Sequence, residues 1–342
     1  MQSTRAAARG KHSKAEVARY FLEMEQNCFM LADALTRGEW RPGAYTTFYV
    51  HEPKKRLISA APFRDRVVHH ALVSLLEPHF ERRFVAHSYA CRKGNGTHKA
   101  LHRASRLMAT RRFVLKGDVK TFFQTIDHEL LKLELRRAIA DERLLRVMDL
   151  VIDSSNPQES EMAWFAGDGL FAPIERRRGI PISNLTSQFL ANVFLDPFDH
   201  FVMDRLRRGD YIRYCDDFLI FGEDRDELWG IREEVRAALA RQRLLLHPRK
   251  GGVHVTHSQV PFLGFVLCRG RRRLQRASLV RATRRLRSLS REVEAGADSD
   301  GLRASLAAWY GHVSHATDAV PLVECVRGRI ATGLVPKMVR TV

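Results

Sequence analysis

Apolar residues recur along the chain with two different spacings, and the spacing predicts where helices and strands lie. Steps of three and four residues predict helices at 14–37, 67–80, 128–152, 186–206, 227–242, 274–294 and 302–316. Runs of β-branched and aromatic residues predict a strand at 113–118 and hairpins at 45–59 and 211–222. The order of strand, helix, hairpin and helix from 113 to 242 predicts a split βαβ sheet with helices on one face.

Two acidic residues lie at the tip of the hairpin predicted at 211–222. Asp216 and Asp217 separate two runs, 211–214 and 218–221, that are rich in strand-forming residues. Adjacent carboxylates in an apolar hairpin repel each other and lose hydration, and a bound divalent cation would offset both effects. A solvated hairpin tip is the simpler interpretation, because Asp is common in turns. This pattern alone leaves both interpretations open.

A third carboxylate ends the strand predicted at 113–118. Asp118 follows a short apolar run and precedes a segment that reads as a helix. Carboxylates on rigid elements that converge on two hard cations about 4 Å apart are what two-metal phosphoryl transfer requires. Asp118, Asp216 and Asp217 together therefore predict such a site.

The chain resembles reverse transcriptases in six segments that follow one another in the same order. Tyr214-Cys-Asp-Asp217 resembles their Tyr-x-Asp-Asp motif, and the segment from Asp118 to Phe123 resembles their first catalytic motif. The other four segments are residues 55–66, 179–188, 246–250 and 262–265. The resemblance implies an α+β right-hand polymerase with fingers, a split βαβ palm and a helical thumb. We expect an N-terminal helical extension at 1–44, fingers and palm at 45–268 and a basic thumb at 269–342.

The resemblance also implies which residues carry the chemistry. Asp118, the backbone carbonyl of Val119, Asp216 and Asp217 would coordinate two Mg²⁺ ions, with Mn²⁺ as an alternative metal. Lys250 lies where the family often has a lysine that protonates the departing pyrophosphate. A surface lysine in a basic turn is the competing interpretation.

Five residues are candidates for contact with the incoming dNTP. Arg56, Arg64 and Arg66 carry guanidinium groups that suit triphosphate oxygens, although each could instead belong to a solvated basic face. By resemblance, Phe123 would place a ring under the sugar and exclude a 2′-hydroxyl, unless it is an ordinary core residue. Ile182 would lie beside the nascent base pair.

Composition indicates an anionic partner. The chain has 57 Lys and Arg against 39 Asp and Glu, a formal charge of +18, which favours nucleic acid. Template RNA and a cDNA or primer strand are the expected partners, with Lys93 near the template and Arg281, Arg284 and Arg285 on the duplex. These arginines belong to the predicted thumb helix.

The sequence shows no sign of membrane attachment or of a zinc site. No apolar run reaches the roughly 18 residues that a span needs, and no signal peptide or lipidation motif is present, so we expect a cytoplasmic protein. The five scattered cysteines predict reduced thiols. His254 and His257 have a spacing that zinc could use, but an alternating run favours the polar face of a strand.

One segment narrows the resemblance further. Ile182 stands where most of the family has Gln, and Gln188 stands where most has Pro. Together with residues 62–71, this resembles the reverse transcriptases of diversity-generating retroelements. Those enzymes copy a template-repeat RNA with errors at adenines and work with a small, basic accessory variability determinant protein. Ser183 departs from that pattern, which usually has Gly.

Two alternatives remain at this stage. The first is an ordinary bacterial reverse transcriptase of retron, abortive-infection or group II intron type; the intron type is least favoured, because the chain ends at residue 342 without a maturase extension. The second is a non-catalytic RNA-binding scaffold, which the intact Asp118, Asp216 and Asp217 disfavour.

Overall fold

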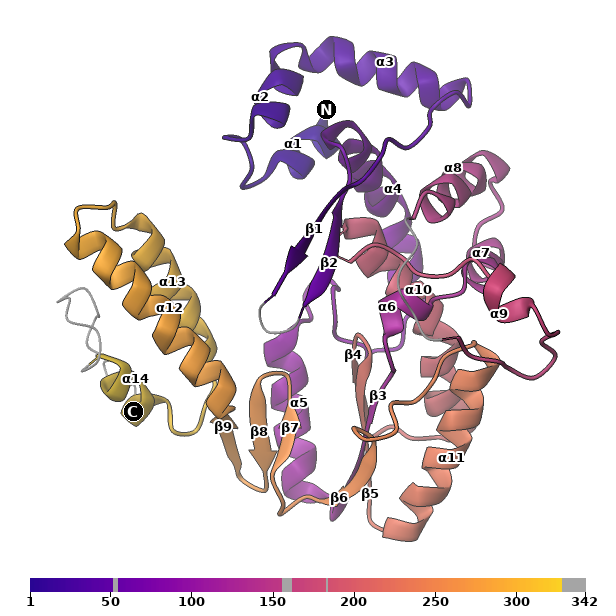
Figure 1. The fold of residues 1–342 in the computed structure, drawn as a ribbon. Helices are drawn as coiled ribbons and strands as arrows, with labels where there is room; N and C mark the ends of the chain where they lie inside the picture. Colours follow the sequence, from indigo (N-terminus) through magenta and orange to yellow (C-terminus); the bar gives the residue numbers. More distant parts are fainter. Residues whose placement is uncertain (52–54, 156–161, 183, 328–342) are drawn as a thin grey trace.

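A four-stranded antiparallel sheet lies at the centre of the molecule (Figure 1). The structure is a computed structural model that describes residues 1–51, 55–155, 162–182 and 184–327. The sheet has the order β4-β5-β3-β6 and consists of β3 (Phe113–Asp118), β4 (Tyr211–Tyr214), β5 (Asp217–Gly222) and β6 (Gly252–Val255). The strand predicted at 113–118 and the hairpin predicted at 211–222 are both confirmed.

The central sheet is covered on both faces. Helices α10 (Leu185–His200) and α11 (Arg225–Arg241) lie against one face. The other is covered by α5 (Thr97–Thr110) and a small sheet of β7 (Val260–Phe262), β8 (Phe265–Cys268) and β9 (Arg271–Leu274). The prediction of helices on one face only was wrong. Successive residues of β5 point to opposite faces, and the four residues from Phe218 to Phe221 are all apolar, so both faces must be buried.

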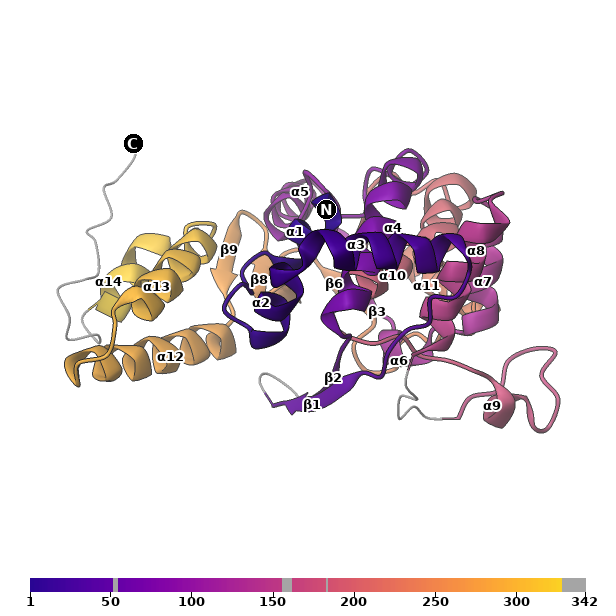
Figure 2. The same cartoon turned by 90° about the horizontal axis from the view of Figure 1, so that it is seen from above.

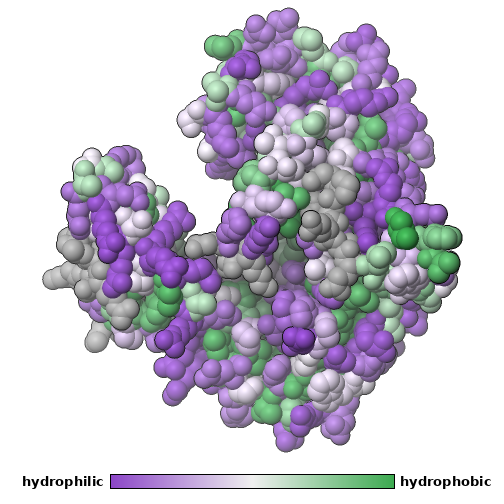
Figure 3. Space-filling model, in the orientation of Figure 1, coloured by the Kyte–Doolittle hydropathy of each residue, from purple (hydrophilic) through white to green (hydrophobic). Residues whose placement is uncertain are grey.

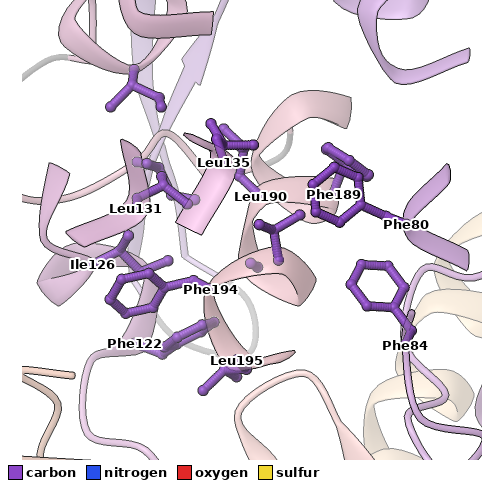
Figure 4. Packing of buried hydrophobic residues seen from close by; sticks show 14 of the residues in the cluster. Phe80, Phe84, Phe122, Ile126, Leu131, Leu135, Phe189, Leu190, Phe194 and Leu195 are labelled. Carbon is purple, nitrogen blue, oxygen red and sulfur yellow. The ribbon is translucent and has the colours of Figure 1, made fainter. Parts of the chain in front are cut away.

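The larger core lies between the sheet and the helices around α10 (Figure 4). It brings together α4 (Phe63–Glu81), α6 (Phe122–Thr125), α7 (His128–Arg136) and α10. Phe80 of α4 contacts Phe189 of α10 edge to face, with ring centroids 5.3 Å apart. The predicted core residues of α10 are all buried, namely Phe189, Leu190, Val193, Phe194 and Phe198.

Two predicted long helices are each two helices. The stripe at 14–37 forms α2 (Ala15–Leu22) and α3 (Met24–Thr36), which are separated by a non-helical backbone at Glu23. The stripe at 128–152 forms α7 and α8 (Glu142–Asp153). Asp141 ends the gap in the second case, because its carboxylate accepts hydrogen bonds from the backbone N–H groups of Arg143 and Leu144.

The remaining N-terminal elements sit over α4. Helix α1 (Gln2–Ala8) buries Thr4, Ala7 and Ala8 against the body. The predicted hairpin at 45–59 is confirmed as β1 (Thr46–Val50) and β2 (Arg56–Ala60), with the residues between them outside the described chain. Helix α9 (Ala172–Glu175) lies between α8 and α10 in the chain, and a π-helical turn (Phe201–Arg205) ends the helix predicted at 186–206.

Three C-terminal helices stand apart from this body (Figures 1 and 2). They are α12 (Arg276–Glu294), α13 (Asp300–Val313) and α14 (Ala319–Arg327), and they share a separate small core that includes Leu286 and Trp309. Figure 3 shows a wide cleft between these helices and the rest of the molecule. The β8–β9 hairpin crosses the predicted boundary at 268/269, so the helical part begins at Arg276. None of the helices in the described residues has the length and apolarity that crossing a membrane requires.

A buried ion pair joins the acidic hairpin to α10. Arg213 of β4 is almost fully buried and donates from Nε and Nη2 to the two carboxylate oxygens of Asp199, at 2.7 and 2.5 Å. Its remaining donors reach Asn192 Oδ1, Ser88 Oγ and the carbonyl of Cys215. All five N–H groups of the guanidinium therefore have an acceptor.

This pair is held in its charged form. Burial alone would lower the pKa of Arg213, but the Asp199 carboxylate raises it above its ordinary value. Tyr211 also donates to Asp199 Oδ1, at 2.6 Å. Cys215 directly precedes Asp216, so the hydrogen bond from Arg213 to the Cys215 carbonyl holds the hairpin tip in place.

Replacing Arg213 with Leu should therefore destabilise the protein strongly. Asp199 would remain buried without its counter-charge, which typically costs about 3–5 kcal/mol. The measurement is urea unfolding followed by circular dichroism. Arg136→Leu is the matched control, because Arg136 pairs with Asp149 near the surface and such a pair contributes about 0–1 kcal/mol. Equal losses in the two variants would contradict the importance given to Arg213.

Candidate active site

The end of β3 and the tip of the β4–β5 hairpin bring the three predicted carboxylates together. Asp118 is the last residue of β3 and lies directly opposite Asp217 in the strand register. The backbone N–H of Val119 donates to the carbonyl of Asp216 at 3.0 Å. The structure thus places Asp118, Val119, Asp216 and Asp217 side by side, from segments about a hundred residues apart in the sequence.

Two local features allow this close approach. Gly117 faces the ring of Phe218 across the strands, and a Cβ atom on Gly117 would lie 2.0 Å from that ring. A larger residue at 117 would push β5 away from Asp118. Cys215 adopts a left-handed backbone with φ 57°, which lets the chain reverse direction in two residues between Tyr214 and Asp217.

Burial and neighbouring negative charges disfavour the ionised form of the carboxylates at the hairpin tip. The pKa of Asp217 is raised to about 6, chiefly by burial and also by the negative charges of Asp216 and Asp118, against the opposing effect of Lys116. Burial also raises the pKa of Asp216, with a contribution from Asp118. A cation beside these groups would relieve both effects.

In this structure a lysine supplies positive charge to Asp118. Lys250 Nζ lies 3.0 Å from both carboxylate oxygens of Asp118. The segment that carries it is tied to β3, because the N–H of His247 donates to the carbonyl of Asp118 at 2.7 Å. His247 Nδ1 in turn accepts from the N–H groups of Arg249 and Lys250. Lys250 therefore belongs to the same site as the carboxylates.

The donor set fits hard divalent cations. Carboxylate and backbone oxygens are the ligands that Mg²⁺ takes from proteins, and water and substrate phosphates usually complete its coordination. Among the described residues, no three His, Cys, Asp or Glu side chains are already grouped as metal ligands. Occupation by a metal would require Lys250 to release Asp118, since its ammonium group now covers both oxygens.

Phe123 and Ile182 lie on segments that the backbone ties together. The N–H of Ile180 donates to the carbonyl of Phe123 at 2.8 Å. Phe123 is half-buried and contacts Phe122 edge to face, with centroids 5.4 Å apart. Ile182 is half-buried in the turn before α10. Ser183 lies outside the described residues.

The predicted triphosphate arginines have different surroundings. Arg56 of β2 is exposed, and Arg64 is exposed apart from a bond to the carbonyl of Arg41. Arg66 is mostly buried and pairs with Glu16 of α2 at 2.9 Å. The contact with Glu16 joins α2 to α4, and Arg64 in turn lies 3.9 Å from the buried carboxylate of Asp65.

The predicted nucleic-acid contacts are on exposed surfaces. Lys93 lies in the turn before α5, and Arg281, Arg284 and Arg285 project from α12. Arg284 lines a groove of about 690 Å³ along α12, together with Arg276, Arg287 and Arg291. His254 lies in β6 as predicted, and His257 Nε2 lies 3.0 Å from Arg269.

Sequence reasoning missed two features of the site. The first is the role of Arg213, although a charged residue in an apolar strand, with Asp199 in an apolar helix, was a readable signal of a buried pair. The second is a small pocket whose wall includes Lys120, two residues after Asp118, together with Arg178 and Arg243. These cations come from three distant segments, so no local pattern could have grouped them.

Known proteins are similar to this chain over the region that contains Asp118, Asp216 and Asp217. A family model for reverse transcriptase (RNA-dependent DNA polymerase) matches residues 50–267. Protein YkfC of Escherichia coli K12 is 27% identical over 285 residues, which cover 71% of this chain and 72% of YkfC.

Two further relatives are much longer proteins. The mitochondrial nuclear intron maturase 1 of Arabidopsis thaliana is 28% identical over 139 residues, covering 35% of this chain and 20% of the maturase. Group II intron-encoded protein LtrA of Lactococcus lactis is 22% identical over 189 residues, covering 54% of this chain and 30% of LtrA. The family model itself matches more than half of the chain. This protein therefore belongs to the reverse transcriptase family and is an RNA-directed DNA polymerase.

Proposed function

We propose that this chain is the error-prone reverse transcriptase of a diversity-generating retroelement. It would copy a template-repeat RNA into cDNA in the cytoplasm, with dNTPs as substrates and an accessory variability determinant protein as a partner. The convergence of Asp118, Asp216 and Asp217 supports polymerase chemistry. Ile182, in the turn before α10, supports the error-prone subclass.

The proposal assigns the three parts of a right-hand polymerase to this fold. The central sheet would be the palm, the β1–β2 hairpin and α4 the fingers, and α12 to α14 the thumb, with residues 1–44 as an extension over the fingers. The cleft in Figure 3 is wide and open, and the exposed arginines of α12 face a groove. Guanidinium groups there would bind the phosphates of a template and primer duplex.

Asp118, the carbonyl of Val119, Asp216 and Asp217 would hold the two Mg²⁺ ions, or Mn²⁺ in their place. Bound metal would supply charge neutralisation at the attacking 3′-hydroxyl and at the leaving pyrophosphate. Lys250 would move from Asp118 toward the pyrophosphate and donate a proton to it. Arg56, Arg64 and Arg66 would contact the triphosphate, and Phe123 would exclude a ribose 2′-hydroxyl.

An ordinary bacterial reverse transcriptase is the second candidate, and the names of two relatives favour it. The relatives include a group II intron-encoded protein and an intron maturase by name. A gene neighbourhood with two near-identical repeats would favour the retroelement, and its absence would favour the second candidate. Primer extension with and without Mg²⁺ separates both from a non-catalytic RNA-binding scaffold.

Asp216→Asn should abolish primer extension while leaving folding and RNA binding intact, because the amide keeps the side chain's shape but loses the charge that holds the metal. The measurement is extension of a labelled primer on a defined RNA. Glu223→Gln, at the far end of the same hairpin, is the control and should extend normally. Activity of the Asp216 variant within about tenfold of wild type would refute this assignment.

Lys250→Leu should slow single-turnover nucleotide incorporation by about 10² to 10⁴, the usual contribution of a general acid. Binding of the dNTP should weaken much less. Rapid-quench kinetics over a range of dNTP concentrations measures both quantities. The neighbouring exposed Arg249→Leu is the control. Equal losses in rate and binding would identify Lys250 as a simple charge contact.

Ile182→Gln should lower the error rate. A Gln could hydrogen-bond near the nascent pair, whereas Ile can only pack, and a discrimination of roughly 1–2 kcal/mol changes errors about five- to thirtyfold. The test is to copy a defined RNA, with the accessory protein present, and count substitutions by template base. Ile182→Leu is the apolar control. An unchanged adenine error rate would reject the role of Ile182, while low and even wild-type errors would reject the retroelement assignment.

A further inference from the structure

Four histidines meet where the C-terminal helices α12–α14 join the body of the molecule. His98 and His102 are four residues apart in α5, so they lie on one face of that helix. The imidazole of His315, which follows α13, stacks on that of His98 with centroids 3.7 Å apart and meets His102 edge to face at 5.5 Å. The ring of His312, in α13, lies 6.2 Å from that of His98. We call these four residues the histidine cluster, and two of them come from each side of the joint.

Apolar contacts and backbone hydrogen bonds also hold this joint together. Ala316 is buried in the same core as residues of α5 and β8, and the ring of His312 contacts Phe265 of β8 with centroids 4.7 Å apart. The backbone N–H of Thr317 donates to the carbonyl of Arg272 in β9 at 2.7 Å, and the N–H of Arg272 donates to Thr317 Oγ1 at 3.2 Å. The joint is therefore a packed contact in which the imidazoles are one part.

Positive groups surround the histidine cluster on the side of the body. They are Lys99, Arg103 and Arg106 of α5 and Arg272 of β9. The three residues of α5 line a groove of about 550 Å³ together with His102. The guanidinium of Arg272 donates to the backbone carbonyl of His315. A proton taken up by the cluster would therefore be added beside existing positive charge.

The remaining elements of the joint bring little negative charge to the cluster. Strand β8 has no charged residue. Asp300 of α13 lies more than three helical turns from His312, and exposed Glu324 lies in the second turn of α14. Asp318, which precedes α14, pairs with Arg273 at 3.4 Å, so its carboxylate already has a cationic partner.

These surroundings favour neutral imidazoles while the joint is closed. Burial lowers the pKa of His102, His312 and His315, and the charge of His98 lowers all three as well. Arg272 further lowers the pKa of His102 and His315. In an open joint each pKa would return toward the ordinary value of about 6.5. Above that pH both states are neutral, but below it the open state binds protons that the closed state does not, so acid favours opening.

We propose that the histidine cluster is a pH-sensitive contact that holds helices α12–α14 against the body at neutral pH and releases them in mild acid. Two protonated rings 3.7 Å apart, such as those of His98 and His315, would repel each other strongly. Release would widen the cleft in Figure 3, because α12–α14 form one of its walls. The inference does not depend on the proposed function, since it concerns the joint and not the reaction.

The test is hydrogen–deuterium exchange of the purified full-length chain, with each protection factor corrected for the intrinsic exchange rate at its pH. The reporter is the Thr317 amide, whose hydrogen bond to the Arg272 carbonyl breaks when the joint opens. Between about pH 7.5 and about pH 5.5 its protection should fall at least about tenfold, the factor that one histidine with an open-state pKa of about 6.5 supplies. Amides in the middle of α11, in the body, should keep their protection.

Two variants that titrate less should show a smaller fall in protection. They are His102→Gln/His315→Gln and, in case the double change loosens the joint at every pH, His102→Gln alone, at the exposed edge of the cluster. The control is His51→Gln/His79→Gln, which removes two exposed histidines outside the joint and should respond to pH as wild type does. No fall in wild type, or an equal fall in the cluster variants and the control, would overturn the inference. A fall that extends to α11 would indicate general acid unfolding and would overturn it too.

Discussion

The active-site hairpin depends on one buried ion pair. A tip that holds two carboxylates is unfavourable by itself, because it combines repulsion with loss of hydration. Arg213 offsets this by using every donor of its guanidinium on acceptors from α10, from the segment before α5 and from the hairpin itself. The same pair connects β4 to α10, the helix that follows the turn containing Ile182. The backbone of the acidic hairpin is therefore linked to α10 through Asp199.

The buried charges of the β4–β5 hairpin have two different kinds of surroundings. Arg213 and Asp199 are sealed from water and stay charged because they neutralise each other. Asp216 and Asp217 have no such permanent partner, and burial raises the pKa of each. Two described lysines supply positive charge nearby: the ammonium group of Lys250 covers Asp118, and Lys116 opposes the rise in the pKa of Asp217. Carboxylates in such surroundings are suited to binding divalent cations.

Two parts of the chain, α12 and the segment from 154 to 175, differ in charge and in exposed side chains. Arginines of α12 line an exposed groove, and guanidinium groups suit phosphate oxygens. The segment from 154 to 175 has the opposite composition and exposes apolar side chains on a framework anchored by Arg176.

Sequence alone determined the parts of this protein that depend on local pattern. Asp118 at a strand end, Asp216 and Asp217 at a hairpin tip and the buried residues of α10 all follow from the local residue pattern, because this pattern reports which side of an element is buried. It does not report what covers that side. Only the tertiary structure paired Arg213 with Asp199, placed Lys250 on Asp118 from 132 residues away and set α5 on the second face of the sheet. These contacts are decided by how separate elements pack, where no local periodicity carries information.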